Sequence, residues 1–153
     1  MEHDKHRWRV QWASWLDLWA ICRLERTVFA EPLSIWSATR YWLTPLTGYL
    51  VIRKGRRIAA YFGFEVMGPV AHVLANVTAP QDRREGLGGA ILRAGEIQAR
   101  RLGARWLMGE VRVSNINQMR VLKRLGWKPA ATVPHFFADG EDAVVYWRVL
   151  DDL

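Results

Sequence analysis

The sequence predicts an α/β chain whose central mixed sheet has about seven strands flanked by about four helices. Short segments with alternating apolar residues, typical of strands, recur along the 153 residues, and apolar residues at helical spacing recur between them. The predicted order is β-α-α-β-β-β-α-β-α-β-β. Strands joined both by helical crossovers and by hairpins indicate a sheet that mixes parallel and antiparallel pairs.

The first half of the chain is predicted to contain four strands and two helices. Ser14 and Asp17 resemble a capping box that begins the first helix, which Glu31 and Pro32 end near Phe29. Ser34 can cap a second, short helix that ends near residue 42. The strands are expected at residues 6–12, 47–53, 57–67 and 70–78.

The second half alternates helices and strands before a closing hairpin. A helix is expected at residues 90–102, where Gly103 stops it, and another at 115–125, with Gly126 just past its end. Asp139 and Gly140 form the predicted hairpin turn. The strands are expected at residues 106–113, 126–137 and 143–150.

Length and composition fit a single domain covering residues 1–153. Half of the residues are hydrophobic, so the chain can bury a core without disulfides. The single Cys22 provides neither an intramolecular disulfide nor a cluster of metal ligands, so we expect a cytoplasmic protein with no metal. The polar N-terminus leads into no long apolar run, and no stretch approaches 18 apolar residues. We therefore expect no signal peptide and no membrane partner.

Net charge and aromatic content do not by themselves select one partner. The formal net charge of +7 favours an anionic partner such as a nucleotide cofactor, RNA or an acidic protein. The basic residues are spread over several elements, so charge alone does not select nucleic acid. Nine residues are Trp, and most of them fall within apolar patterns, so we expect these side chains to line the core or a cleft.

A glycine-rich segment after the strand at 70–78 predicts an anion site. It reads Arg83, Arg84, Glu85, Gly86, Leu87, Gly88 and Gly89. Glycines let the backbone approach an anion closely, and the free N–H groups at the start of the next helix bind phosphate. Residue 91 is Ile, which excludes the G-x-G-x-x-G dinucleotide pattern, and no Gly-Lys-Ser/Thr follows. The alternative is a glycine helix cap beside solvated arginines.

Two motifs in this part of the chain resemble one enzyme family. Arg83-x-x-Gly86-x-Gly88 matches the pyrophosphate motif Q/R-x-x-G-x-G/A of the GCN5-related N-acetyltransferases (GNAT). The block from Glu110-Val-Arg-Val-Ser-Asn115 to Leu125-Gly-Trp127 resembles that of the bacterial ribosomal-protein alanine N-acetyltransferases. The tail from Phe136 to Ala143 is similar to the last hairpin of those enzymes. Upstream, Ser14-x-x-Asp17-Leu18 and Glu25…Pro32-Leu33-Ser34 resemble the first helices of the family, so the resemblance covers nearly the whole chain.

The resemblance implies the GNAT acyl-CoA N-acyltransferase fold and acetyl-CoA as cosubstrate. The pantetheine arm would lie between the strands of Val77 and Glu110. A backbone N–H near Val77 and Thr78 would polarise the thioester carbonyl, and Asn115 would hydrogen-bond the arm. Glu110 occupies the position of the general base that deprotonates the attacking amine. Glu65 and His72 are alternative bases, and Glu110 could instead point outward and pair with an Arg.

The family's acceptor position falls on Glu31, Phe136 and Phe137. The two Phe residues replace a Tyr pair, and Leu122 replaces a Tyr proposed to protonate the leaving thiolate. The leading interpretation is an N-acetyltransferase acting on a protein N-terminal amine, such as that of a ribosomal protein. Acetylation of a small amine or a Lys side chain, a non-catalytic acyl-CoA-binding module and a basic RNA-binding module are the alternatives. We expect a monomer or a homodimer.

Overall fold

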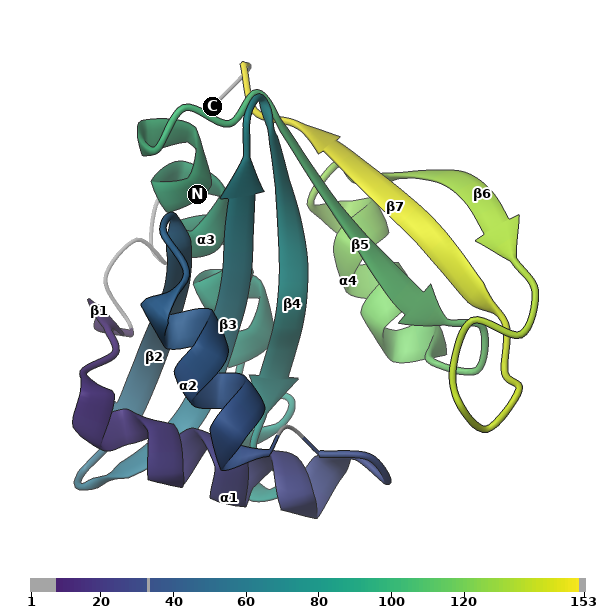
Figure 1. Cartoon of the computed structure of the whole chain (residues 1–153). Helices are drawn as coiled ribbons and strands as arrows, with labels where there is room; N and C mark the ends of the chain where they lie inside the picture. Colours follow the sequence, from purple (N-terminus) through teal and green to yellow (C-terminus); the bar gives the residue numbers. More distant parts are fainter. Residues whose placement is uncertain (1–7, 33, 152–153) are drawn as a thin grey trace. The chain divides into compact units, whose positions relative to one another are not determined.

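The computed structural model describes residues 8–32 and 34–151, and in this part seven strands form one mixed sheet (Figure 1). Its strand order is β1-β2-β3-β4-β5-β7-β6, with β4 and β5 parallel. The strands are β1 (Val10–Trp12), β2 (Thr47–Lys54), β3 (Arg57–Met67), β4 (Val70–Thr78), β5 (Trp106–Arg112), β6 (Lys128–Val133) and β7 (Ala143–Val149). The helices are α1 (Leu18–Val28), α2 (Ile35–Leu43), α3 (Leu87–Arg101) and α4 (Ile116–Arg124), with short 3-10 helices η1 (Trp15–Asp17) and η2 (Pro80–Asp82). The predicted fold class is confirmed.

The element order matches the prediction, but two boundaries differ where they affect function. Helix α3 begins at Leu87 rather than at residue 90, so Gly88 and Gly89 form its first turn. Strand β6 ends at Val133, so Phe136 and Phe137 lie in the loop before β7 and not in a strand. His135 has a φ of +52°, which breaks the extended backbone there. Residues 6 and 7 of the predicted first strand lie outside the described residues.

The described chain packs into two compact units. Unit 1 contains residues 8–64 and 75–95, and unit 2 contains residues 65–74 and 96–151. Strands β3 and β4 and helix α3 each contribute residues to both units. A single domain covering residues 1–153 stays a prediction.

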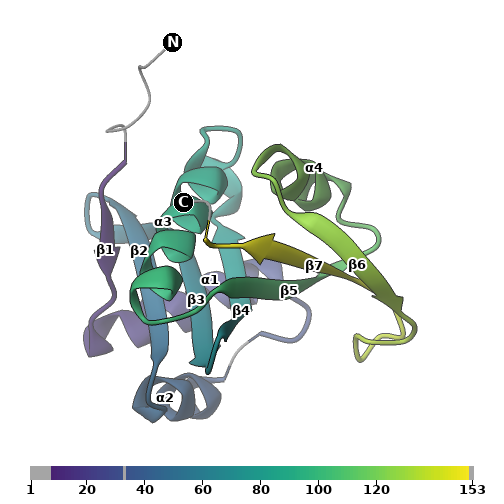
Figure 2. The ribbon, with the colours of Figure 1, turned by 90° about the horizontal axis from the view of Figure 1, so that it is seen from above.

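Unit 1 is a layer of strands with helices on both faces (Figures 1 and 2). On one face, Ile21 and Leu24 of α1 pack with Val51 and Tyr61 of the sheet. On the other face, α3 crosses β3 so closely that a Cβ on Gly95 would lie 2.3 Å from the ring of Phe62. Successive strand residues point to opposite faces, which is why Tyr61 and Phe62 serve the two helical layers.

In unit 2, β5 and β7 are antiparallel along their whole length, and α4 lies beside β6 and β7 (Figure 2). Trp127, just after α4, is 4% exposed, and its indole N–H donates to Oε1 of the fully buried Glu96 at 2.7 Å. The guanidinium of Arg148 lies 3.6 Å from the same carboxylate oxygen. The hydrogen bond and the cation offset the cost of burying this carboxyl group.

Most of the tryptophans do not line the core, and the alternative that they line a cleft stays a prediction. Trp15, Trp19 and Trp36 are 67%, 65% and 82% exposed, and Trp12 and Trp147 are exposed as well. In α1 the inward positions are occupied by aliphatic residues, so the apolar pattern extends around the helix and leaves its Trp outside. No helix among the described residues is long and apolar enough to cross a membrane.

We predict that Gly95→Ala destabilises the protein although Ala favours helix formation. A Cβ at residue 95 would lie 2.3 Å from a ring carbon of Phe62, so the ring or the helix has to move. The matched control is Gly89→Ala in the same helix, where a Cβ meets nothing within 4 Å. Urea denaturation should show a loss of roughly 1–3 kcal/mol for Gly95→Ala and none for the control. Equal stability of the two variants would contradict this packing.

Candidate active site

The glycine-rich segment of unit 1 runs from the end of β4 into the first turn of α3. Gly86 has a φ of +85°, which a residue with a side chain rarely adopts. Arg84 also has a positive φ, of +67°, and a non-glycine residue held in that region costs about 1 kcal/mol or more. The first backbone N–H groups of α3 have no partner within the helix. The segment therefore has the backbone geometry of an anion site.

A buried carboxylate anchors this segment. Asp82, at the end of η2, is 2% exposed and accepts hydrogen bonds from Arg57, one of them at 2.8 Å. Lys54 lies 3.0 Å from Asp82 and 2.6 Å from Glu85. The hydrogen bond from Arg57, together with Lys54, lowers the pKa of Asp82 to about 2 although burial opposes the shift. Asp82 therefore remains charged at neutral pH and ties the segment to the β2–β3 hairpin.

The residues predicted to hold the cofactor fit a pyrophosphate group. Arg83 and Arg84 are exposed, and neither forms an ion pair with another described residue. A Cβ on Gly88 would lie 3.3 Å from Oγ1 of Thr78, so the end of β4 and the start of α3 are close together. Val77 is buried beside this point. Glu85 is the exception, because its carboxylate is bound by Lys54 and so helps to hold the segment in place.

In unit 2, His72 of β4 and Glu110 of β5 form a pair. Nε2 of His72 lies 2.7 Å from Oε2 of Glu110, and since a carboxylate only accepts, the imidazole N–H donates. His72 is opposite Met108 in the parallel register, so Glu110 lies two residues further along on the same face. The Glu110 side chain is 16% exposed and that of His72 is 29% exposed. Glu110 thus pairs with a histidine rather than with an arginine.

The electrostatics of this pair favour a proton on the histidine. The hydrogen bond with Glu110 raises the pKa of His72 above its ordinary value of 6.5; burial opposes this, and the charges of Glu110 and Glu65 add to it. His72 and Glu110 are therefore in direct contact, and Glu65 acts on His72 through its charge. A carboxylate and an imidazole in contact can accept a proton and share it.

The start of α4 lies in the same unit. Asn115 caps this helix, because its Oδ1 accepts from the N–H of Gln118 at 3.2 Å, and its amide NH₂ group points away from that bond as a possible donor. Leu122, at the position of the missing Tyr, is 3% exposed and belongs to the packed interior of unit 2. An aliphatic side chain there stabilises the helix but cannot donate a proton.

The predicted acceptor residues fall in two segments. Glu31 is exposed between α1 and α2 in unit 1. Phe136 and Phe137 lie in the loop between β6 and β7 in unit 2, with their rings edge to face and 5.1 Å apart. Phe136 is 47% exposed, whereas Phe137 is half-buried against the guanidinium of Arg112, which lies 4.0 Å from the ring centre.

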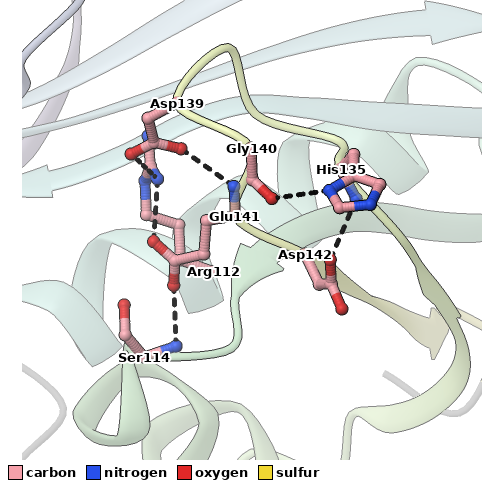
Figure 3. A network of polar contacts seen from close by, with 7 residues as sticks. All are labelled: Arg112, Ser114, His135, Asp139, Gly140, Glu141 and Asp142. Carbon is pink, nitrogen blue, oxygen red and sulfur yellow. Dashed lines mark hydrogen bonds and ion pairs between the residues drawn. The ribbon is translucent and has the colours of Figure 1, made fainter.

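The structure thus gathers the predicted residues into two sets. From the sequence, His72 is only an alternative base, and no role is predicted for Arg112 or Glu141, which organise the loop of Phe136 and Phe137 (Figure 3). The first set, in unit 1, contains Val77, Thr78, Arg83, Arg84, Glu85, Gly86, Leu87, Gly88, Gly89 and Glu31; the second, in unit 2, contains Glu110, Asn115, Phe136 and Phe137. The Glu-Val-Arg block was the signal that could have indicated Arg112.

The sequence profile of the acetyltransferase (GNAT) family matches residues 10–127. The chain belongs to this family. The predicted family is thereby confirmed. Membership of this family means that the protein is an N-acetyltransferase, which is an acyltransferase enzyme.

Individual relatives agree with this assignment. A Bacillus subtilis protein provisionally named [ribosomal protein bS18]-alanine N-acetyltransferase is 27% identical over 141 residues, which covers 89% of this chain and 91% of that protein. The crystal structure of the ribosomal-protein-S18-alanine N-acetyltransferase from Escherichia coli has a TM-score of 0.84 at 23% identity, covering 94% of both chains. A Salmonella typhimurium protein solved with its cofactor acetyl-CoA has a TM-score of 0.80 at 18% identity, covering 95% of both chains. The TM-scores of these two structures show that the chain has the GNAT fold.

We predict that His72 titrates above pH 6.5 and that Glu110→Gln lowers its pKa, because the amide removes the negative charge that favours the imidazolium. The raised pKa also means that the pair stabilises the fold fully below pH 6.5 and loses this effect as the pH rises through the folded-state pKa. NMR titration of the histidine ring protons measures the pKa of His72 in the wild type and in Glu110→Gln. Asp151→Asn, which affects a distant exposed pair with Arg105, is the control. An unchanged His72 titration in Glu110→Gln would show that the pair does not form.

Proposed function

We propose that this GNAT enzyme transfers the acetyl group of acetyl-CoA to a primary amine, with a protein N-terminal α-amine as the leading acceptor. The hydrogen-bonded pair of His72 and Glu110 is the observation on which the proposal rests. Amine acetylation needs a group that takes a proton from an ammonium ion, and this pair provides one on the strand that carries the family's Glu-Val-Arg block. The ribosomal acceptor is suggested by the name of the Bacillus subtilis relative.

The glycine-rich segment would hold the pyrophosphate of acetyl-CoA. The N–H groups at the start of α3 and the positive end of its dipole favour an anion, and Arg83 and Arg84 add charge-assisted hydrogen bonds. Asp82 keeps the segment in place through Arg57 and Lys54, so these N–H groups are oriented before the ligand arrives. Backbone N–H groups near Val77 and Thr78 would bind the thioester carbonyl oxygen, and the Asn115 amide would bind the pantetheine arm.

Glu110 would take the proton from the acceptor ammonium, directly or through a water molecule. The hydrogen bond from His72 fixes one carboxylate oxygen, Oε2, and leaves Oε1 to receive the proton. The free amine would then attack the acetyl carbon that acetyl-CoA supplies, the carbon–sulfur bond would break with its electron pair leaving on sulfur, and the nitrogen would release its second proton to solvent as the amide forms. His72, when protonated, also provides positive charge beside the carboxylate of Glu110.

The sulfur would leave without a tyrosine to protonate it, because the corresponding residue is the buried Leu122. A thiol has a pKa near 8.5, so a thiolate is a tolerable leaving group at neutral pH. We therefore propose slow but real turnover, with the thiolate protonated by solvent. The loss of this acid affects the rate and not the identity of the reaction.

A small amine or a Lys side chain is the second candidate acceptor. Phe136 and Phe137 lack the hydroxyl groups that would hydrogen-bond a peptide backbone, so their loop presents an apolar wall. Glu31, exposed in the segment after α1, could contact a cationic acceptor of either kind. A panel of Ala- and Ser-starting peptides against spermidine separates the two candidates, since the better acceptor shows the higher kcat/KM.

We predict that acetyl-CoA raises the melting temperature, because a ligand that binds only the native state stabilises it. Replacing Arg83 and Arg84 together by Ala should weaken acetyl-CoA binding about tenfold or more, since two charge-assisted contacts are lost. Calorimetric titration measures the Kd for acetyl-CoA directly. Arg23→Ala, an exposed residue of α1, is the matched control for lost charge. The absence of any shift at saturating acetyl-CoA would contradict the proposed function.

We predict that Glu110→Gln lowers kcat on the best amine of the panel about a hundredfold or more, the usual value of general base assistance. The glutamine preserves size and hydrogen bonding but cannot accept the proton. Asp151→Asn, which also neutralises one carboxylate, should retain the wild-type rate. If Glu110→Gln acetylates as fast as the wild type, Glu110 is not the base.

A further inference from the structure

The loop between β6 and β7 is long for a hairpin and is fastened by its own polar groups (Figure 3). Val133 and Ala143 are paired, and the nine residues 134–142 connect them, whereas hairpin loops commonly have about two to five residues. Phe137 and Gly140 close a turn within the loop through an N–H···O bond of 2.8 Å. The backbone N–H of His135 donates to Asp142 at 2.9 Å.

Arg112, the last residue of β5, joins this loop to the strand. Its Nη1 donates to Oδ2 of Asp139 and to Oε2 of Glu141, both at 2.8 Å. The same guanidinium lies over the ring of Phe137. One side chain thus contacts two carboxylates and an aromatic face, and the planar guanidinium can lie flat on the ring while its N–H groups bind the carboxylates.

Glu141 extends the connection to the start of α4. Its second oxygen, Oε1, accepts from the backbone N–H of Ser114 at 2.9 Å, one residue before the helix cap Asn115. Hydrogen bonds from Ser114, together with Arg112, lower the pKa of Glu141 to about 2, so the carboxylate is charged at any working pH. The loop, the end of β5 and the start of α4 are therefore joined through one ionised carboxylate.

The charges explain why the connection depends on Arg112. Residues 139–142 contain three carboxylates, those of Asp139, Glu141 and Asp142. Arg112 is the cation that contacts two of them in the described structure. Without it the carboxylates repel one another and the ring of Phe137 loses its partner, so the loop would open.

We propose that Arg112 is a positioning residue for the acceptor: it holds loop 134–142 against the start of α4 and so fixes the wall formed by Phe136 and Phe137. This inference rests on the proposed function, because it assigns the acceptor to that wall. Among the described residues Arg112 contacts Asp139, Glu141 and Phe137, and no contact with Glu110 or His72 is among them. Its removal should weaken acceptor binding while leaving the proton transfer at Glu110 largely unchanged.

We predict two effects of Arg112→Met. Backbone N–H groups of Ser114, His135, Phe137 and Glu141 should exchange with deuterium about tenfold faster or more, because they are bonded within this connection. The KM for the acceptor, tested with an Ala-starting peptide and with spermidine, should rise about tenfold while kcat changes little. Arg112→Lys keeps the charge but not the planar guanidinium. Its amide exchange rates and its KM for the acceptor should fall between those of the wild type and of Arg112→Met.

Arg105→Met is the matched control. Arg105 precedes the same strand, forms one ion pair with Asp151 at 2.9 Å and lies over the ring of Trp106, but it does not contact the loop. Arg105→Met should change neither the deuterium exchange of the loop amides nor the KM for the acceptor. Should Arg112→Met prove unfolded by circular dichroism, Arg112→Lys decides by the same two measurements.

The possible failures are distinguishable. Unchanged amide exchange in the folded Arg112 variant would overturn the connection itself. Faster exchange with an unchanged acceptor KM, or with an equal loss in kcat, would overturn the positioning role. If the wild-type protein acetylates neither probe nor any amine of the panel, the proposed function fails, and the exchange measurement still decides whether Arg112 holds the loop.

Discussion

A carboxylate that leaves water must be matched by a cation or by hydrogen-bond donors, and this constraint fixes each functional segment of the chain. Asp82 is matched by Arg57 and Lys54, which sets the position of the glycine-rich segment. Glu110 is matched by His72 across two parallel strands. In each case the charge interaction orients a group that the proposed acetyl transfer requires. These pairs therefore contribute to geometry as well as to stability.

The glycine-rich segment shows how such anchoring supports an unfavourable backbone. Arg84 and Gly86 both have positive φ, and for the arginine this conformation costs free energy. The salt bridges on either side, at Asp82 and Glu85, offset this cost. The backbone N–H groups at the start of α3 are then available to an anion without further rearrangement, which favours binding because little ordering remains to be done.

The fold followed closely from the sequence, since most elements are set by local pattern and local capping. The bounds of β3 and β4 agree with the alternating segments at 57–67 and 70–78, and Ser34 caps α2 as predicted. The exceptions have local causes that pattern does not reveal. Gly88 and Gly89 belong to the first turn of α3 although glycine disfavours helix formation. The aromatic pair Phe136 and Phe137 has strand-like composition but lies in a loop that ionic contacts define.

The sequence by itself determined the α/β order and the family, and it predicted an anion site in the glycine-rich segment and Glu110 as the base, because all of these depend on short contiguous patterns and motifs. Only the tertiary structure decided what Glu110 and Arg112 contact. His72 and Glu110 are 38 residues apart, and Arg112 and Glu141 are 29 residues apart. Strand register brings the first pair together, and a loop closed by opposite charges brings the second. Neither register nor loop closure has a periodic signal in one sequence, because both depend on partners far along the chain.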